Sequence, residues 1–202
     1  MADTSELDAL IVRNIGDVEA ALIRGRELGH SLIEEMGALI ERERPDWSVA
    51  LNLDDDVPLK FGPRSWLNRG ENSANCQFHL NEFAGPGGDE EETWLSGLMN
   101  VGPAGVSIAL YFWSDTFNKK KRWKQLALDR QSVISDLLER GFRQDSDQWL
   151  YLPLVLTPDD VALGFQTGDL DIALKPFGDI VSTIAASVPE LETIIERDEL
   201  VS

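Results

Sequence analysis

Five runs of aromatic and β-branched residues constrain the fold more than any other feature of this 202-residue sequence. Such runs are typical of β-strands, and turn-rich segments separate them. They are WSVALNL (47–53), NCQFHLNEF (75–83), TWLSGLM (93–99), VSIALYFW (106–113) and QWLYLPLVL (148–156). The segment NVGPAG (100–105) is typical of a hairpin connection between the third and fourth runs. Consecutive strands without helices between them predict a mainly antiparallel sheet of about five strands in an α+β fold.

A helical pattern precedes the first strand. Apolar residues recur every three or four positions over residues 4–44, and Pro45 ends the pattern. The pattern predicts either one long helix with a bend or two helices that meet near Gly25. Because the chain is too short for two full-sized domains, we expect a single domain over 1–202, in which the sheet and further helices occupy 45–202.

Two further regions are expected to be helical. An amphipathic helix is predicted over about 118–140, with Gly141 as its C-cap. Its apolar stripe, which should pack on the sheet, comprises Trp123, Leu126, Ala127, Val133, Ile134, Leu137 and Leu138. The C-terminal helices are expected near 169–187 and 189–198, with breaks at Pro176 and Pro189.

Composition and charge limit the classes of protein and of partner. Hydrophobic residues make up 43% and charged residues 27% of the chain, which is typical of a globular protein. The apolar runs are shorter than the roughly 20 residues of a transmembrane helix, so no membrane association is expected. Acidic residues near the N-terminus do not resemble a secretory signal, and the single cysteine cannot form an internal disulfide, so we expect a cytoplasmic protein. The net charge of -18 disfavours nucleic acid as a partner.

One basic segment interrupts this acidic chain, since residues 119–143 hold 8 Lys or Arg against 3 Asp or Glu. Its candidate binding residues are Lys119, Lys120, Lys121, Arg122 and Lys124, with Phe117 or Trp123 as an apolar anchor. One interpretation is a recognition site for an anionic partner, including a nucleic-acid contact through 119–124. The other is a cationic cluster that is solvated or neutralised by the protein's own acids, such as those at 89–92.

Common catalytic signatures do not occur in the sequence. It contains no phosphate-binding GxxxxGK[ST] loop, no GxGxxG, no GxSxG elbow and no HExxH pair. With two histidines and one cysteine, neither a three-histidine metal site nor a four-thiolate zinc site can form. We therefore expect no cofactor, and an enzyme is the less favoured class.

The single cysteine and one histidine lie three residues apart on an expected strand. Alternation directs Cys76 and His79 to opposite faces, so they are not a nucleophile and its base in a regular strand. We expect Cys76 to be a buried structural thiol. His79 shares its face with Gln77 and Asn81, which predicts either a solvated sheet face or the lining of a groove. His30 is expected to be exposed on the polar flank of the first helix.

Acidic clusters supply the enzymatic alternative. Asp54, Asp55 and Asp56 are oxygen donors for a hard divalent cation, although their spacing lacks the calcium-loop pattern and a solvated turn is the favoured interpretation. The alternative function is a degenerate metal-dependent nuclease or phosphodiesterase that uses these acids. Its further candidate groups are Glu82, Asp171, Lys60 and Lys175.

One stretch resembles a known family. It runs from VSIALYFWSDTFNKKKRWKQLALDRQSVISDLLERGF through QWLYLPLVL, and WLNRG (66–70) matches an earlier part. The stretch is similar to a domain of unassigned function found at the C-terminus of some restriction-endonuclease-like proteins. That family shows a strand, an Asn-Lys turn, a helix with the spacing FxxLxxxKxxIE and a tryptophan-led strand. The resemblance implies a binding or accessory module linked to nucleic-acid or defence systems, and it supplies no catalytic residues.

Together these features predict a non-catalytic binding or accessory module that engages a macromolecular partner, and protein is the favoured class of partner. The acidic faces suit a basic partner, as in an inhibitor or immunity-type protein, because opposite charge speeds association. The N-terminal helix is also a candidate surface for a homo-oligomer.

Overall fold

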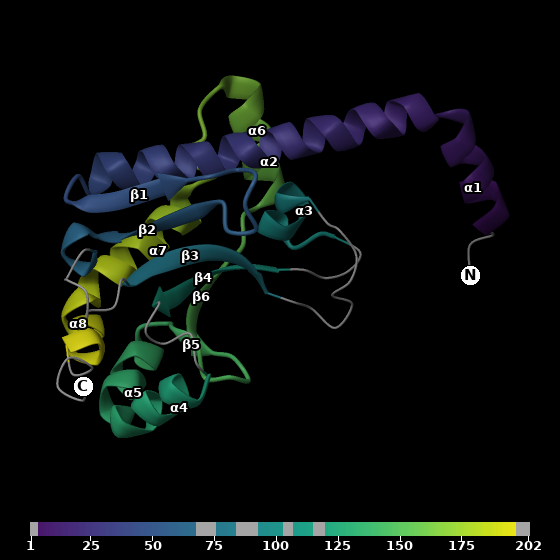
Figure 1. Cartoon of the computed structure of the whole chain (residues 1–202). Helices are drawn as coiled ribbons and strands as arrows, with labels where there is room; N and C mark the ends of the chain where they lie inside the picture. Colours follow the sequence, from purple (N-terminus) through teal and green to yellow (C-terminus); the bar gives the residue numbers. More distant parts are fainter. Residues whose placement is uncertain (1–3, 68–75, 84–92, 103–106, 115–119, 197–202) are drawn as a thin grey trace.

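The structure is a computed structural model, and it describes residues 4–67, 76–83, 93–102, 107–114 and 120–196. In these residues a six-stranded antiparallel sheet has the strand order β1-β2-β3-β4-β6-β5 (Figure 1). The strands are β1 (Trp47–Leu51), β2 (Leu59–Pro63), β3 (Cys76–Phe83), β4 (Ser107–Ser114), β5 (Arg143–Gln144) and β6 (Leu150–Leu154). The α+β class and the antiparallel sheet are confirmed, with one strand more than the expected five.

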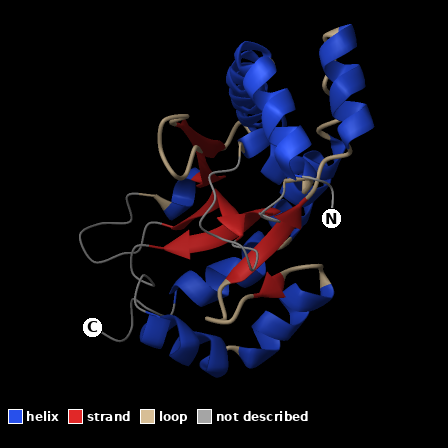
Figure 2. Cartoon of the chain, turned by 90° about the vertical axis from the view of Figure 1, so that its right-hand side faces the viewer, coloured by secondary structure: helices blue, strands red, loops and turns tan. Residues whose placement is uncertain are grey.

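Helices flank the sheet, and Figure 2 shows the strands in the middle of the body with helices above and below them. The helices are α1 (Thr4–Arg13), α2 (Ile15–Glu43), α3 (Trp94–Met99), α4 (Lys120–Asp129), α5 (Gln131–Glu139), α6 (Pro158–Thr167), α7 (Lys175–Ala186) and α8 (Val188–Glu196). A 3-10 turn, η1 (Arg64–Trp66), follows β2. Among the described helices, none combines the length and the apolar character needed to cross a membrane.

One face of the sheet carries the hydrophobic core. Phe61, Phe78 and Phe112, three inward residues of the strands, are at most 1% exposed. The Phe78 and Phe112 rings lie 5.5 Å apart, and Phe177 of α7 meets Phe61 edge to face at 6.1 Å. Burial of such rings dominates the stability of a core. Tyr111 and Trp113 of β4 and the outward positions of β6 alternate with the core positions and are half-buried, as expected for an antiparallel sheet.

The N-terminal helical segment divides at Asn14. The Asn14 side chain Nδ2 donates to the Leu10 carbonyl at 2.8 Å, so it satisfies a carbonyl at the end of α1 and competes with the helical backbone pattern. Beyond this break α2 runs for 29 residues through Gly25, and Pro45 follows its end. The prediction of a long N-terminal helix is confirmed, whereas the position of the break near Gly25 was wrong.

Helix α3 occupies residues 94–99, so the strand expected over 93–99 was wrong. Thr93 caps the helix because its side chain accepts a hydrogen bond from the Ser96 N–H at 3.3 Å. At the other end Asn100 adopts the left-handed conformation, with φ of 51°, that terminates many helices. A six-residue helix that is capped at both ends overrides the strand propensity of its aromatic and apolar residues. The expected hairpin between 93–99 and 106–113 was therefore wrong, because the first of these segments is not a strand; residues 103–105 of its connection lie outside the described residues.

The sequence pattern missed β2 and α6. Gly62 and Pro63 weaken the strand signal of β2, although all five of its residues pair with β1. Helix α6 begins at Pro158, and Pro176 and Pro189 likewise stand in the first turns of α7 and α8. The prolines therefore begin these helices, where a missing N–H costs nothing, and do not break them.

The helix expected over 118–140 consists of α4 and α5, which are separated at Arg130. Gly141 ends α5 with φ of 102°, and the Phe142 N–H donates to the Leu137 carbonyl, so the predicted C-cap is confirmed. Most of the apolar stripe packs inward as expected. Leu138 is the exception, because it is 40% exposed.

Candidate functional site

A row of side chains crosses the outward face of the sheet, where β3 and β4 lie in its middle. The register places Lys60 opposite His79, His79 opposite Tyr111, and Tyr111 opposite Tyr151. Residues directly opposite in an antiparallel pair have neighbouring side chains. Tyr111 and Tyr151 accordingly stack with their ring centroids 5.3 Å apart. The row places aromatic side chains next to one another on a face that the core does not use.

A pocket of about 380 Å³ opens beside this row. Its lining combines aromatic and polar groups from β3, β4 and the segment between β5 and β6: His79, Asn81, Glu82, Tyr111, Phe112, Trp113, Asp145 and Trp149. A concave site with aromatic walls and a few polar groups is the usual form of a small-ligand or side-chain pocket. We take it as the candidate functional site and call it the sheet-face pocket.

His79 forms one wall of the sheet-face pocket. Its imidazole stacks on the Trp113 indole with ring centroids 4.8 Å apart, and the residue is 9% exposed. Burial is the main cause that lowers the pKa of His79 to about 4; the positive charge of Lys60 acts in the same direction, and Asp55 opposes the shift. The imidazole is therefore neutral near pH 7. Within the described part of the chain, its Nε2 has no hydrogen-bond partner, although it is buried.

Two carboxylates and a phenol contribute polar groups to the same pocket. Asp145 Oδ1 accepts hydrogen bonds from the Asp147 and Trp149 backbone N–H groups at 2.8 and 2.9 Å, which fixes the carboxylate in place. Burial raises the pKa of Tyr111, and the charge of Asp145 adds to the effect, so the phenol stays protonated. With Glu82 also in the lining, two acidic residues and a neutral imidazole border the pocket. Such a site favours a cationic ligand over an anionic one.

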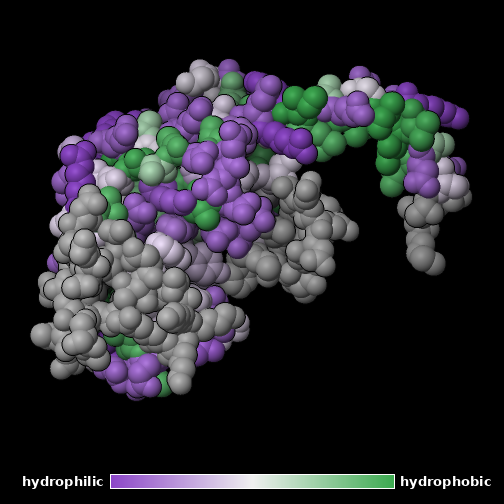
Figure 3. Space-filling model, viewed as in Figure 1, coloured by the Kyte–Doolittle hydropathy of each residue, from purple (hydrophilic) through white to green (hydrophobic). Residues whose placement is uncertain are grey.

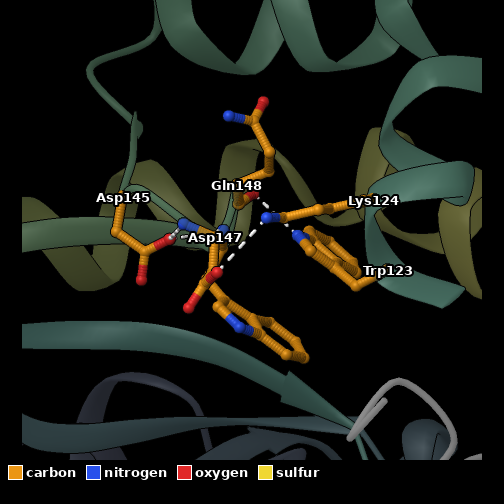
Figure 4. A network of polar contacts seen from close by, with 6 residues as sticks. Trp123, Lys124, Asp145, Asp147 and Gln148 are labelled. Carbon is orange, nitrogen blue, oxygen red and sulfur yellow. Dashed lines mark hydrogen bonds and ion pairs between the residues drawn. The ribbon is translucent and has the colours of Figure 1, made fainter. Parts of the chain in front are cut away.

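The predicted basic segment has a structural role at this end of the sheet. Trp123 is fully buried, stacks on Trp149 at 5.1 Å, and donates its indole N–H to the Gln148 carbonyl at 2.7 Å. Lys124 forms an ion pair with Asp147 at 3.3 Å. Figure 4 shows both side chains pointing from α4 toward the turn that carries Asp145, Asp147 and Gln148. These contacts attach α4 to the turn that supplies one wall of the pocket.

Trp123 is buried, as expected for the apolar stripe, so it does not serve as the apolar anchor, which would have required exposure. The pairing of Lys124 agrees with neutralisation by the protein's own acids, but through Asp147 and not through the loop at 89–92. Phe117 and Lys119 lie outside the described residues, and so does that loop. Lys120, Lys121 and Arg122 lie in the first turn of α4. An anionic recognition site there stays a prediction.

The predicted metal ligands do not converge in the structure. Asp55 pairs with Lys60 at 3.2 Å, and this hydrogen bond and charge lower the pKa of Asp55, whereas Asp54 and Asp56 are exposed. Asp171 contacts Arg42 at 3.6 Å, and Lys175 pairs with Asp179 inside a helix, not a strand. Among the described residues, no group of three or more acidic, histidine or cysteine side chains is arranged to hold a metal ion.

Some of the remaining predictions for the cysteine and the histidines are confirmed, and others are wrong. Cys76 is fully buried, which confirms the structural thiol. The solvated sheet face expected for His79 was wrong, because Trp113 and the strand row cover the ring, while the groove lining is confirmed. His30 is half-buried and not exposed.

Sequence reasoning missed most of the pocket. Tyr111 and Trp113 occupy alternate positions of one strand, and this spacing was the available signal that they share a face. Asp145 and Trp149 join them only through the pairing of β5 with β6. That pairing depends on a turn in which Gln148 has φ of 70°. No sequence pattern predicted this turn.

Fold and site together define an α+β domain whose antiparallel sheet is packed on one face and carries an aromatic, acidic pocket on the other. No protein-family model, curated protein or solved structure matches the chain. The resemblance to a domain of restriction-endonuclease-like proteins therefore stays a prediction.

Proposed function

We propose that the protein is a non-catalytic binding module for a basic protein partner, and that the sheet-face pocket takes an arginine side chain of that partner. The observation that carries this proposal is the lining of the pocket, which places Trp113 and Trp149 beside Glu82 and Asp145. A cation is attracted to the face of an indole ring. The planar guanidinium group adds two-point hydrogen bonding to a carboxylate, which a lysine ammonium does not offer.

The chemistry of His79 favours binding over catalysis. A histidine with a pKa of about 4 is a weak base near pH 7, and it lies far from the value that suits a general acid or base. Its buried Nε2 instead supports a role in hydrogen bonding to a ligand. The stack on Trp113 fixes the direction in which this nitrogen points.

The charge of the whole chain supports a basic partner. A net charge of -18 attracts cationic surfaces over distances set by the ionic strength and raises the rate of association. An inhibitor or immunity-type protein of the cytoplasm has this character, and the single buried Cys76 fits a reducing compartment. We extend the proposal to an accessory role beside a nucleic-acid or defence enzyme, which rests on the family resemblance alone.

The experiment is a titration of the full chain with three acetylated pentapeptides that differ at one position. Gly-Gly-Arg-Gly-Gly is compared with its lysine analogue and with its citrulline analogue, which keeps the shape of arginine without the charge. Binding is followed by the indole N–H signals in NMR spectra. We expect the arginine peptide to shift the signals of Trp113 and Trp149 and the citrulline peptide to leave them unchanged, with lysine in between.

Matched variants locate the binding. Asp145→Asn removes one charge from the pocket but keeps the oxygen that accepts the two backbone N–H groups of the turn. Asp56→Asn removes the same charge at an exposed position away from the pocket. We expect Asp145→Asn to weaken arginine binding about tenfold and Asp56→Asn to leave it nearly unchanged. Equal effects of the two variants, or equal binding of the citrulline peptide, would contradict the proposal.

A further inference from the structure

An apolar arm extends from the body of the protein. It comprises α1 and the first half of α2, residues 4–28, and Figure 1 shows it reaching well beyond the sheet. Half of the large hydrophobic residues that are exposed in the described part of the chain lie within it: Leu7, Leu10, Ile11, Val12, Ile15, Leu22 and Ile23. Figure 3 shows hydrophobic residues gathered along this arm. An apolar patch of this kind on a soluble protein marks an interaction surface.

The apolar stripe of the arm continues the core stripe of the same helix. Within the body, Leu32, Met36 and Ile40 of α2 are fully buried under the sheet and its neighbours. Steps of three or four residues carry the same face of the helix back through Leu22 to Ile15. These two residues are 52% and 50% exposed. The helix thus presents a core-like face where the described part of its own chain does not cover it.

The charges beside the stripe are arranged in a self-complementary way. Glu19 and Arg26 lie seven residues apart, which is two helical turns, so they occupy the same flank of the stripe. Leu22 lies between them. When two copies of the helix cross in opposite directions near Leu22, Glu19 of each copy comes beside Arg26 of the other. A parallel pair would instead place the two Glu19 side chains on opposite sides of the contact, and likewise the two Arg26 side chains, so these charges would not pair.

The charge of the rest of the molecule also favours contact through the arm. Two copies of a chain with a net charge of -18 repel each other when their acidic bodies approach. The arm holds Arg13, Arg24 and Arg26 among its acids, so it is the less acidic part, and it extends away from the body. Contact through the two arms buries the apolar stripes while the bodies remain apart.

We propose that the arm is a homodimerisation element that pairs antiparallel with the arm of a second copy, about a two-fold axis near Leu22. The contact is isologous, since each copy contributes the same stripe and the same two charges. The proposal is independent of the pocket, and either can fail without the other.

The first test is the molar mass of the full chain by sedimentation equilibrium. We expect a dimer for the wild type. Leu22→Glu combined with Ile23→Glu places charge in the stripe and should weaken association about tenfold or more, while circular dichroism stays native. The matched control places two glutamates at Leu163 and Ile172, which are exposed on the body, and should remain dimeric. A monomeric wild type at about 100 μM, or equal dissociation of both variants, would overturn the proposal.

The second test fixes the direction of pairing. Glu19→Arg and Arg26→Glu should each weaken the dimer, because each places like charges side by side, and the double variant should restore it. In addition, Leu22→Cys should form an interchain disulfide on mild oxidation, whereas Ile15→Cys should not, because Cα atoms more than about 7 Å apart cannot be bridged. The native Cys76 is buried and does not interfere. Cross-linking at both positions, or no rescue by the double variant, would overturn the antiparallel pair.

Discussion

His79 of β3 and Trp113 of β4 stack with an angle of 17° between their rings and a centroid distance of 4.8 Å. They are diagonal neighbours, because the register places Gln77 opposite Trp113 and Tyr111 opposite His79. The stack removes the imidazole from water, and this burial is the main reason why its pKa falls to about 4. One aromatic contact therefore controls both the shape of the pocket wall and its charge.

Stability should depend on pH through His79. An unfolded histidine has a pKa of about 6.5, so between this value and about 4 the unfolded chain binds a proton that the folded chain excludes. The contribution of His79 is therefore fully present above pH 6.5 and is lost as the pH falls toward 4. We expect a loss on the order of 3 kcal/mol by pH 4, measured by urea unfolding at several pH values.

His79→Gln supplies the comparison for this prediction, since glutamine is planar and polar but does not titrate. Acidic residues contribute the same pH dependence to both proteins, so the difference between them isolates His79. Parallel stability curves for the wild type and the variant between pH 4 and 6.5 would show that the histidine is not excluded from protonation.

Replacement of Lys60 by methionine should raise two pKa values at once. The ammonium of Lys60 donates to Asp55 at 3.2 Å and lowers the pKa of Asp55, and its charge also lowers that of His79. Without it, both values should move toward their ordinary ranges, which NMR titration of the two side chains would follow. Lys175→Met is the control, because Lys175 pairs with Asp179 on a different element. A change in only one of the two groups would contradict the shared cause.

Substitution of Trp123 should lower the free energy of unfolding more than substitution of Lys124. Trp123→Phe removes the N–H that bonds the Gln148 carbonyl and leaves space beside Trp149, at a cost of about 1 to 3 kcal/mol. Lys124→Met removes a partly exposed ion pair, which is worth less than about 1 kcal/mol. Chemical unfolding of both variants checks the order. A larger effect of Lys124→Met would mean that the ion pair, and not the indole, attaches α4.

Gly141 should resist substitution because of its backbone conformation. With φ of 102° it occupies a region in which a side chain is strained, although a methyl group there would meet no neighbouring atom. Gly141→Ala should therefore cost about 1 kcal/mol or more, and Gly141→Asn should cost less because asparagine tolerates positive φ. Thermal unfolding of the two variants tests this order. An alanine variant as stable as the wild type would show that the turn adjusts freely.

The fold could be predicted from the sequence where one local signal dominated. The alternation in β4 and the periodicity of α2 each extend over many residues, so these local patterns predicted the two elements correctly. Helix α3 shows the opposite case, because Thr93 and Asn100 set its ends and outweighed the strand propensity between them. Strand β2 carries Gly62 and Pro63, and only its pairing with β1 stabilises it.

The candidate site was less predictable for a physical reason. Its walls come from three parts of the chain that meet only after β5 and β6 have paired. Local sequence patterns do not determine the long-range register of a sheet. The charges of the basic segment contrast with the acidic remainder of the chain, and this contrast led to the prediction of a recognition site. Trp123 lies in the interior, as the apolar stripe predicted, because helical periodicity places it on the face that packs on the sheet.

The strand order has a consequence for how the molecule is built during synthesis. From β1 to β4 each strand lies beside the one that precedes it in the chain, so the growing sheet can add strands in the order in which they leave the ribosome. The short connection between β1 and β2, residues 52–58, keeps the entropy of closing this first hairpin small. The C-terminal helices complete the process, as the Trp66 indole N–H donates to Glu192, 126 residues later. Nascent chains that lack α8 would thus carry a paired sheet whose core is not yet closed.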